Sequence, residues 1–420
     1  MINPQERFFT GGQICFGSSE DPRSRVHCEV FDWDQLRWVT IVGTAKLFPR
    51  DEDAEIPIFA RLVDELPSDA HRATVDDDGF LVSVSTDPEN DYTLYVPYLR
   101  YSTLESLRDC RTVQYHQLHE IDRLGPGVDL SSYQDEDGNN VQVAFKFNPW
   151  EHITRRQMIW NEIHILKNLP THPNLVPFDR VVLGGFDSRV IGFTTKYITG
   201  GTLNQNTTIP FRLKWLQQLT NLVDFLNLEL GIMHQDIAPR NLLIDPETQD
   251  LLLFDFNWAV CGSAELLDGR DDVTGAVFTV YELITNDTHY TSIPHWERDM
   301  NTVQDLPEWV PDRQLDSDVS TFRKFLNEWV ATRKADGDME RYLNAPRRLT
   351  LPPLPHPPEY DVPFEAGATL NGKPVPSKGA RYRRHAIANG QYCFDWQRPP
   401  QNFSLRNGNG WHQPTSGARL

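Results

Sequence analysis

The residues Gly231–Asp255, GIMHQDIAPRNLLIDPETQDLLLFD, combine polar side chains with two short apolar runs. His234, Asp236 and Asn241 follow the spacing H-x-D-x-x-x-x-N. A segment rich in turn-forming residues joins the apolar runs, and this pattern predicts a hairpin of short strands. Asp255 comes directly after the second run. We therefore expect two carboxylates and a carboxamide at the ends of short strands.

Helical periodicity is present on both sides of this hairpin. Phe211–Leu230 places leucine and valine on one helical stripe, and Gly231 is suited to end that helix. Asp272–Thr285 is largely apolar and predicts a buried helix. Val319–Ala335 is amphipathic and predicts a helix with one buried face. The chain around and after the hairpin is thus expected to be mainly helical.

The region before these helices is expected to be rich in strands. Val113–Asp122, Val141–Phe147 and Val190–Tyr197 have the alternation or β-forming composition of strands. Leu124–Val128 contains two glycines and predicts a turn. Thr154–Leu169 predicts a helix that begins at a capping threonine.

The bulk composition limits the possible partners. The chain has 420 residues and a formal net charge of −19, which argues against nucleic acid or an anionic membrane as a partner. Its five cysteines are scattered, as expected for reduced thiols rather than a disulfide framework or a zinc site. We see neither a signal peptide nor an apolar run long enough to span a bilayer. A cytoplasmic or nuclear location is expected.

Both ends of the chain differ from the central region. Residues 1–110 carry no catalytic signature and alternate strand-forming runs with acidic or proline-rich breaks, which predicts a mixed α/β extension. Residues 346–420 are rich in proline and then basic, which predicts a poorly ordered tail. The expected elements of the extension are four strands and one short helix: Val26–Trp33, Trp38–Leu47, Phe80–Ser85, Tyr92–Tyr101 and Ile58–Leu66.

Several motifs, taken in order, resemble those of the protein kinase superfamily. Lys146 ends the strand motif VAFK, Glu162 lies sixteen residues later (162 − 146), and HQDIAPRN and Asp255 follow. Through HQDIAPRNLLID the chain is similar to diverged protein-kinase-like proteins of filamentous fungi. The resemblance implies an α+β, two-lobed protein-kinase-like fold. The implied domain is 111–345, divided into a small β-rich N-lobe, 111–197, and a helical C-lobe, 198–345.

The resemblance implies a part in phosphoryl transfer for the residues of the opening stretch. Asp236 would be the catalytic base for a substrate hydroxyl, and His234 and Arg240 would belong to the same catalytic loop. Asn241 and Asp255 would hold Mg²⁺, because both supply the hard oxygen donors that this ion prefers. Without the resemblance, an interpretation of the Asp and Asn side chains as turn or cap residues stays open.

The resemblance also implies an ATP site. Lys146 would bind the α- and β-phosphates, with Glu162 as its ion-pair partner. Taken alone, an exposed strand lysine and a glutamate on a solvated helix face would be the simpler interpretations. Asp272 would anchor the backbone of the catalytic loop, although a plain helix N-cap is an equal alternative. The other implied ATP-binding residues are Gly125, Gly127, Ala144 and the hinge residues Tyr197 and Ile198, with Thr195 in the gatekeeper position.

The sequence departs from the protein kinase pattern in four places. Pro126 interrupts an abbreviated glycine loop and lacks an amide donor. Ala238 stands where serine/threonine kinases have a lysine, and the arginine two residues later gives the arrangement of tyrosine kinases. Asp255 is followed by Phe-Asn rather than Phe-Gly. Only seventeen residues separate Asp255 from Asp272 (272 − 255), with no A-P-E motif.

These departures leave three functions open. The first is a Mg²⁺/ATP-dependent kinase acting on a hydroxyl group, nominally that of Ser or Thr in a protein. The second is a small-molecule phosphotransferase like the aminoglycoside or choline kinases, which also lack A-P-E. The third is a pseudokinase that binds nucleotide or serves as a scaffold, against which the retained Asp236, Asn241 and Asp255 argue.

Overall fold

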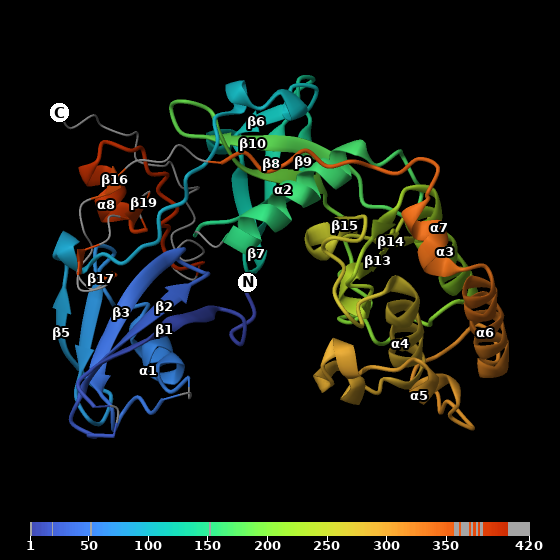
Figure 1. Cartoon of the computed structure of the whole chain (residues 1–420), viewed down its shortest axis with the longest axis horizontal. Helices are drawn as coiled ribbons and strands as arrows, with labels where there is room; N and C mark the ends of the chain where they lie inside the picture. The colour runs from blue at the N-terminus through green and yellow to red at the C-terminus, as the bar shows by residue number, and fades with distance from the viewer. Residues whose placement is uncertain are drawn as a thin grey trace. The chain divides into compact units, whose positions relative to one another are not determined.

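The computed structural model describes residues 2–18, 20–50, 53–150, 153–356, 361–362, 369–370, 373–374, 377–378 and 381–401. The chain forms two compact units (Figure 1). The first comprises Met1–Ile153, Arg180–Thr194 and Pro355–Leu420, and the second comprises Thr154–Asp179 and Thr195–Leu354.

The first unit contains a five-stranded N-terminal sheet of order β1-β2-β3-β4-β5, with α1 packed on one face (Figure 1). The strands near β2, β3 and β5 and the helix near α1 confirm the sequence prediction. The elements are β1 (Phe8–Phe16), β2 (Arg25–Asp32), β3 (Arg37–Thr44), α1 (Glu55–Leu62), β4 (Arg72–Val75) and β5 (Leu81–Ser85).

Three parts of the N-terminal extension differ from expectation. The short strand β4 was not predicted. β1 was not predicted, because a bulge between Thr10 and Gly12 interrupts its alternation. The strand predicted over Tyr92–Tyr101 is wrong, since this segment forms only isolated bridges at Leu94 and Arg100. Proline within the segment removes a backbone donor and explains the lack of a continuous ladder.

A second sheet in the first unit carries the expected ATP-binding strands, in the order β6-β10-β11-β9-β8-β7. The strand predicted over Val113–Asp122 is divided by a 3₁₀ turn, in which the side chain of Gln117 accepts the N–H of Gln114 at 2.9 Å. β6 and β7 consequently lie at opposite edges. The strands are β6 (Thr112–Gln114), β7 (His119–Gly125), β8 (Val128–Gln134), β9 (Asn140–Phe147), β10 (Phe178–Gly184) and β11 (Arg189–Lys196).

The two faces of this second sheet have different surroundings. Lys146 of β9 pairs with Val128 of β8, so the two side chains share one face. Phe145 and Phe147 point to the other face, where they join a buried aromatic core. That core is completed by residues of the N-terminal sheet, including Phe31, Trp33 and Trp38, and by Trp396 near the end of the chain.

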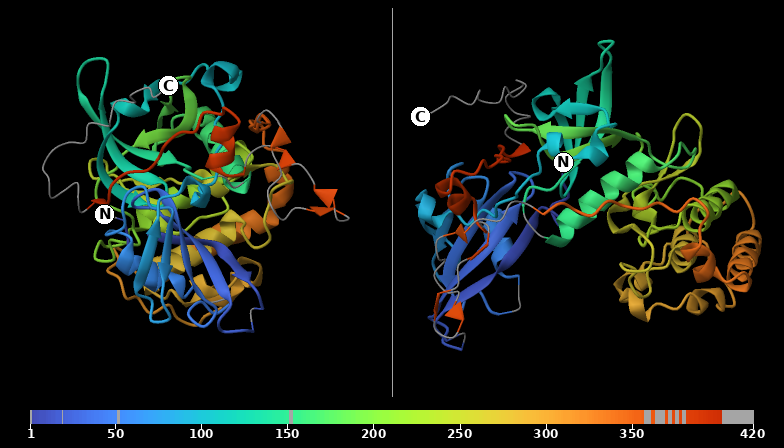
Figure 2. Two further views of the ribbon diagram at one scale, coloured as in Figure 1. Left: turned by 90° about the vertical axis from the view of Figure 1, so that its left-hand side faces the viewer. Right: turned by 45° about the horizontal axis from the view of Figure 1, so that its top comes forward.

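The C-terminal segment differs in part from the poorly ordered tail that we expected over 346–420. Residues 381–401, here called the strap, contain α8 (Arg383–Ala388) and lie beside the N-terminal sheet in every view (Figures 1 and 2). The basic composition suggested a solvated tail, but Trp396 is only 6% exposed and Arg398 bonds to the buried carboxylate of Asp129. Residues 402–420 of the predicted tail lie outside the described residues.

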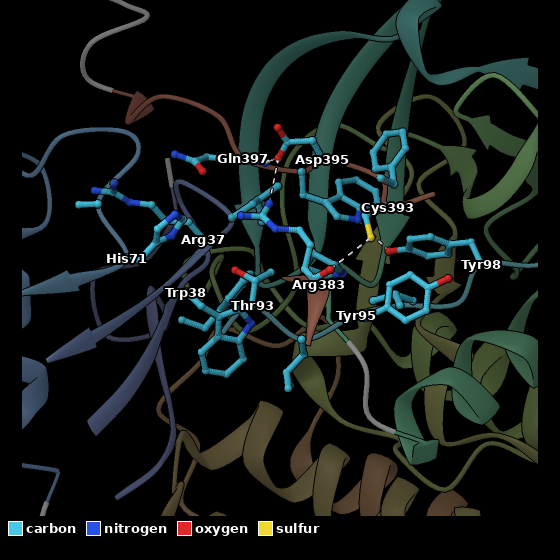
Figure 3. A pocket seen from close by; sticks show the side chains of 18 residues that line it. Arg37, Trp38, His71, Thr93, Tyr95, Tyr98, Arg383, Cys393, Asp395 and Gln397 are labelled. Carbon is cyan, nitrogen blue, oxygen red and sulfur yellow. Dashed lines mark hydrogen bonds and ion pairs between the residues drawn. The ribbon is translucent and has the colours of Figure 1, made fainter. Parts of the chain in front are cut away.

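The strap and the N-terminal sheet enclose one small cavity (Figure 3). Trp38, Tyr98 and Phe394 contribute aromatic walls, and Arg383 also lines the cavity and donates to the carboxylate of Asp91. The cavity measures about 30 Å³. Because one water needs roughly 10–15 Å³ of such volume, the cavity holds about two waters and is too small for a nucleotide.

The second unit is mainly helical, as the sequence predicted. α4 and α6 have the predicted bounds, and α3 continues as a π-helical turn over Phe225–Glu229 before Gly231, whose φ is +60°. The β13–β14 hairpin lies between α3 and α4 in the chain. The elements are α2 (Ile153–Asn168), α3 (Leu213–Asp224), β12 (Ile232–Met233), β13 (Leu242–Ile244), β14 (Leu251–Leu253), β15 (Val260–Cys261), α4 (Asp272–Thr285), α5 (Asn301–Gln304), α6 (Val319–Ala335) and α7 (Asp338–Leu343).

The turn between β7 and β8 consists of Pro126 and Gly127. Gly127 has φ +73°, and an added Cβ would lie 2.6 Å from the carbonyl oxygen of Phe147. We expect Gly127→Ala to lower the free energy of unfolding by about 2–4 kcal/mol, because a left-handed non-glycine residue alone costs roughly 1–2 kcal/mol and the contact adds to it. Chemical denaturation measures the loss.

Gly138 provides a matched control for this substitution. It also has a positive φ, +81°, but an added Cβ would meet no atom within 4 Å. Gly138→Ala should therefore lose only the backbone term, about 1–2 kcal/mol. Equal losses in the two variants would contradict the close packing of Gly127 on β9.

Candidate active site

Asp272, at the start of α4, anchors the catalytic loop. Its carboxylate accepts the backbone N–H of His234 at 2.8 Å and of Gln235 at 2.7 Å. The side-chain amide of Asn227 donates a third bond at 2.7 Å. Burial raises the pKa of the Asp272 carboxyl, and these donors oppose the rise. The N-cap of α4 is Asp271, so the alternative of a plain N-cap is excluded for Asp272.

His234 links the loop to the segment that leads to Asp255. Its Nε2 lies 3.2 Å from the carbonyl oxygen of Phe254, which can only accept, so Nε2 carries the proton. Nδ1 then accepts the backbone N–H of Asp236 at 3.3 Å. The ring also contacts Phe256 edge-on, with centroids 4.7 Å apart. His234 thus connects the loop to the segment that leads to Asp255.

The carboxylate of Asp236 is held by two neighbours in the chain. Asn241 donates its amide nitrogen to Oδ2 at 2.8 Å and to the backbone carbonyl of Asp236 at 2.9 Å. Arg240 bonds to Oδ1 at 2.5 Å, and its side chain remains 56% exposed. Asp236 itself is 8% exposed, so its oxygens are fixed but still reached by solvent.

The hairpin brings Asp255 to the same end as Asn241. Leu242 pairs with Leu253, so the residue before β13 and the residues after β14 are neighbours. The backbone N–H of Phe254 donates to the carbonyl of Asn241 at 3.2 Å. Asp255 follows with φ 65°, a left-handed conformation that is strained for a residue other than glycine.

The donor chemistry of this pair fits a magnesium ion. Asn241 uses its amide nitrogen toward Asp236, which leaves its Oδ1 as the ligand atom. Asp255 supplies a carboxylate, and Mg²⁺ is commonly bound by one or two such groups together with phosphate oxygens. In the described part of the chain, no group of three or more His, Cys, Asp or Glu side chains forms a separate metal site.

Gln235 is a structural residue of the loop that sequence reasoning missed. It adopts φ 62°, and its side-chain amide donates to the carbonyl of Trp258 at 2.8 Å. Its Oε1 accepts the N–H of Leu267 at 2.7 Å. Gln235 therefore joins the catalytic loop to the short segment before α4. Its occurrence between His234 and Asp236 was the one available signal.

Arg270 is a second residue of the site that sequence reasoning missed. Its guanidinium donates to the carbonyl of Gln235 at 3.2 Å and lies 3.8 Å from Oδ1 of Asp236. It also stacks over the ring of Trp258, at 4.4 Å from the centroid. Burial lowers the pKa of Arg270, and Asp236 opposes that change. Two arginines, Arg240 and Arg270, therefore face the carboxylate of Asp236.

The other predicted ATP-binding residues are divided between the units. Lys146 and Ala144 lie on the sheet face opposite the aromatic core. Glu162 belongs to the second unit and is 1% exposed, which excludes a solvated helix face. The expected Lys146–Glu162 ion pair stays a prediction.

The glycine loop is shorter than expected. Gly125 pairs with Val128, so it ends β7 and the loop proper has only two residues. Pro126 and the positive φ of Gly127 are the combination that a type II turn requires. Because Pro126 has no N–H, this turn offers few amides to phosphate groups.

The predicted hinge follows β11. Lys196 donates its backbone N–H to the carbonyl of Pro177 at 3.0 Å, and β11 ends there. Ile198 is buried against Val176 and Leu252 of the second unit. The pairing of the Tyr197 and Ile198 backbone with adenine, and the gatekeeper place of Thr195, stay predictions.

The anchored loop, the hairpin and the buried helix define a kinase-like catalytic core. Residues 118–296 match the family model of the protein kinase domain. CBL-interacting serine/threonine-protein kinase 16 of Arabidopsis thaliana is 34% identical over 154 residues, which cover 34% of this chain and 30% of that protein. CBL-interacting protein kinase 5 of Oryza sativa subsp. japonica is 32% identical over 162 residues, covering 36% and 34%.

A yeast relative extends this similarity. Casein kinase II subunit alpha' of Saccharomyces cerevisiae is 32% identical over 108 residues, covering 25% of this chain and 31% of that protein. The chain spans about a third of the length of these curated relatives. Residues 118–296 are thus similar to a protein kinase domain, and these kinase relatives support membership of the protein kinase superfamily. A separate finding is that no helix among the described residues is long and apolar enough to cross a membrane.

The bonds from the Asp272 carboxylate to the catalytic loop predict a specific effect of Asp272→Asn. The amide would present an N–H group to donors that now bind a carboxylate, so the loop would shift and Asp236 with it. We expect turnover to fall by about 10²-fold, as for other small displacements of a catalytic group. Steady-state kinetics on the folded variant measures this loss.

Asp271→Asn is the matched control. Asp271 accepts the N–H of Thr274 at 2.8 Å as the N-cap of the same helix, and asparagine is an equally good cap. This variant should keep its turnover. A similar loss in both variants would show that the helix start as a whole, rather than the bonds to the loop, matters.

Proposed function

We propose that this chain is a Mg²⁺/ATP-dependent kinase that transfers the γ-phosphoryl group of ATP to a hydroxyl group, namely that of Ser or Thr in a protein. The observation that supports this best is the placement of Asp236. The carboxylate lies in an anchored loop, in contact with Asn241, which shares one end of the hairpin with Asp255. A scaffold protein has no physical need for that set.

Asp236 would orient the acceptor hydroxyl and take its proton as the bond to phosphorus forms. Asn241 holds Oδ2 in place through its amide. Arg240 shares Oδ1 and is half-exposed, so it can turn toward the transferred group and stabilise its negative charge. Arg240 would thereby supply the positive charge of the lysine that serine/threonine kinases have at the position of Ala238.

The metal and nucleotide would use residues already described. Asn241 and Asp255 would hold Mg²⁺, which, when bound, neutralises charge across the β- and γ-phosphates. Lys146 would bind the α- and β-phosphates, and Gly125 and Gly127 would cover them from the short turn. Because this turn offers few amides, we infer that Lys146 contributes more to nucleotide binding here than it would beside a long glycine loop.

Asp236→Asn tests the assignment of the base. We expect turnover to fall by about 10²–10⁴-fold, the usual contribution of a general base, while Mg-ATP still raises the melting temperature. Asp245→Asn is the matched control, because Asp245 lies at the far end of the same hairpin and only caps its turn through the N–H of Glu247. Full turnover in Asp236→Asn would reject the assignment of Asp236 as the catalytic base.

Nucleotide binding by the unsubstituted chain is the more basic test. Thermal unfolding with and without Mg-ATP should show a rise of the melting temperature, and omission of Mg²⁺ should diminish it. If Mg-ATP causes no rise, both the kinase and any other ATP-dependent activity are rejected.

A small-molecule phosphotransferase is the second candidate, favoured by two observations. The segment between Asp255 and Asp272 is short and carries no A-P-E. A cavity of about 310 Å³ in the second unit is lined by Pro239 of the catalytic loop and by polar side chains of neighbouring segments. Its size suits a small polar molecule. The polar lining residues are Asn204, Thr207, Thr208, Glu282, Asn286, Asp312, Arg313 and Gln314.

The two acceptor classes are separated by a direct comparison. Purified chain with labelled ATP is tested against a Ser/Thr peptide array and a panel of hydroxyl-bearing metabolites. Label on peptides alone supports the protein kinase. Label on a metabolite alone, lost when Thr207 or Asn286 is changed to a bulky residue that fills the cavity, supports the second candidate and rejects the first.

A further inference from the structure

The strap contacts the strands that carry the nucleotide-binding residues. Arg398 forms two bonds to the carboxylate of Asp129, at 2.5 and 3.2 Å. It also bonds to Glu120 of β7 at 3.0 Å. Asp129 lies two residues after Gly127, on β8. The bidentate geometry fixes direction as well as distance, because the guanidinium is a planar fork.

Neighbouring residues of the strap extend this contact along β7. The side-chain amide of Gln401 donates to Asp122 at 2.6 Å. In return, the guanidinium of Arg123 donates to the carbonyl of Pro399 at 3.0 Å. Both strands of the β7–β8 hairpin are thus bonded to the strap, β8 through Asp129 and β7 through several side chains.

Trp396 makes the corresponding contact with β9. Its ring stacks on Phe147, with centroids 4.7 Å apart and planes inclined by 15°. Phe147 follows Lys146 directly, and its backbone N–H donates to the carbonyl of Gly127 at 2.9 Å. The strap, β9 and the glycine turn are therefore joined by a stacking contact and a hydrogen bond.

The strap lies on the reverse face of the nucleotide-binding strands. Phe147 and Phe145 point to the aromatic core, whereas Lys146 and Ala144 point to the opposite face. Trp396 belongs to the core. The strap can therefore support these strands without entering the nucleotide side of the sheet.

Arg398 also holds the N-terminal extension in the same contact. Its Nε donates to the carbonyl of Asp34 at 2.9 Å, and its backbone N–H donates to Gln35 at 3.0 Å. The side chain of Asp34 in turn bonds to Arg123 at 2.7 Å. The β2–β3 connection, the strap and the β7–β8 hairpin meet at these buried charges.

We propose that Arg398 and Trp396 are positioning residues for the nucleotide: they hold the β7–β8 hairpin and β9 so that Gly127 and Lys146 are in place before ATP binds. This rests on the proposed function. The short turn offers few amides of its own, so its position must be supported from behind. Loss of this support weakens ATP binding and leaves the chemistry at Asp236 unchanged.

The test uses full-length variants and separates KM from kcat. Arg398→Met removes the charge and keeps much of the apolar stem. We expect the KM for ATP to rise about tenfold with kcat changed by less than about threefold, because only a binding interaction is lost. Trp396→Ala should act in the same direction, and Trp396→Phe should restore part of the affinity by restoring the stack.

Arg383→Met is the matched control. Arg383 is in the same strap and pairs with Asp91 at 3.0 Å, but Asp91 lies outside the β7–β8 hairpin and β9. Its KM for ATP should stay within about twofold of the unsubstituted chain. An unchanged KM in folded Arg398→Met, or an equal rise in Arg383→Met, overturns the proposal.

A second readout does not depend on activity. Amide hydrogen exchange of Glu120–Val128, measured without nucleotide, should become faster in Arg398→Met and not in Arg383→Met. If Arg398→Met does not fold, Arg398→Lys keeps the charge without the fork and should show an intermediate KM and exchange rate. Unaltered amide exchange in a folded Arg398 variant overturns the proposal, whether or not the unsubstituted chain binds Mg-ATP. Failure of the unsubstituted chain to bind Mg-ATP is a different outcome, and it rejects the proposed function.

Discussion

The catalytic loop depends on one buried carboxylate. Asp272 is removed from water at the start of α4, so its charge must be met by donors within the protein. The backbone N–H groups of His234 and Gln235 meet it, and each such charge-assisted bond contributes roughly 1.5–3 kcal/mol. To point both N–H groups inward, the loop must turn sharply, and Gln235 takes the left-handed conformation. That turn brings Asp236 into contact with Asn241.

The same carboxylate also ties the loop to the helices around it. Asn227 donates to Asp272, and its side-chain oxygen accepts from Arg333 of α6 at 2.9 Å. Arg333 continues to Asp224 of α3 and to Asp338 of α7. A network of alternating donors and acceptors thus extends from the catalytic loop through α4 to α6, α3 and α7. Such a network has one consistent arrangement, which gives the loop a single conformation.

The elements predicted correctly are those that local patterns determine. The β13–β14 hairpin follows from its turn residues, and Asp272–Thr285 and Val319–Ala335 have the predicted helical bounds. The Asp236, Asn241 and Asp255 set was recognisable because its members lie within one hairpin and the loop before it. Asp272 was recognised only by resemblance, and the structure then removed the N-cap alternative.

The features that were missed depend on contacts between distant residues. Arg398 and Asp129 are 269 positions apart, and no local pattern connects a basic, proline-rich tail with a carboxylate on β8. Composition alone therefore indicated a solvated segment. Gln235 and Arg270 act through the backbone of a segment with no regular structure, for which periodicity gives no signal. The division of the predicted strand over Val113–Asp122 involves a capping box of side-chain bonds between Gln114 and Gln117, which periodicity does not reveal.

The segment between Asp255 and α4 is short, and its contacts hold the catalytic loop in place. Gln235 bonds to the carbonyl of Trp258 and to the N–H of Leu267, near the two ends of that segment. Arg270 then returns to the carbonyl of Gln235 and stacks on Trp258. Few residues need to be ordered, so the entropic cost of ordering this segment is small.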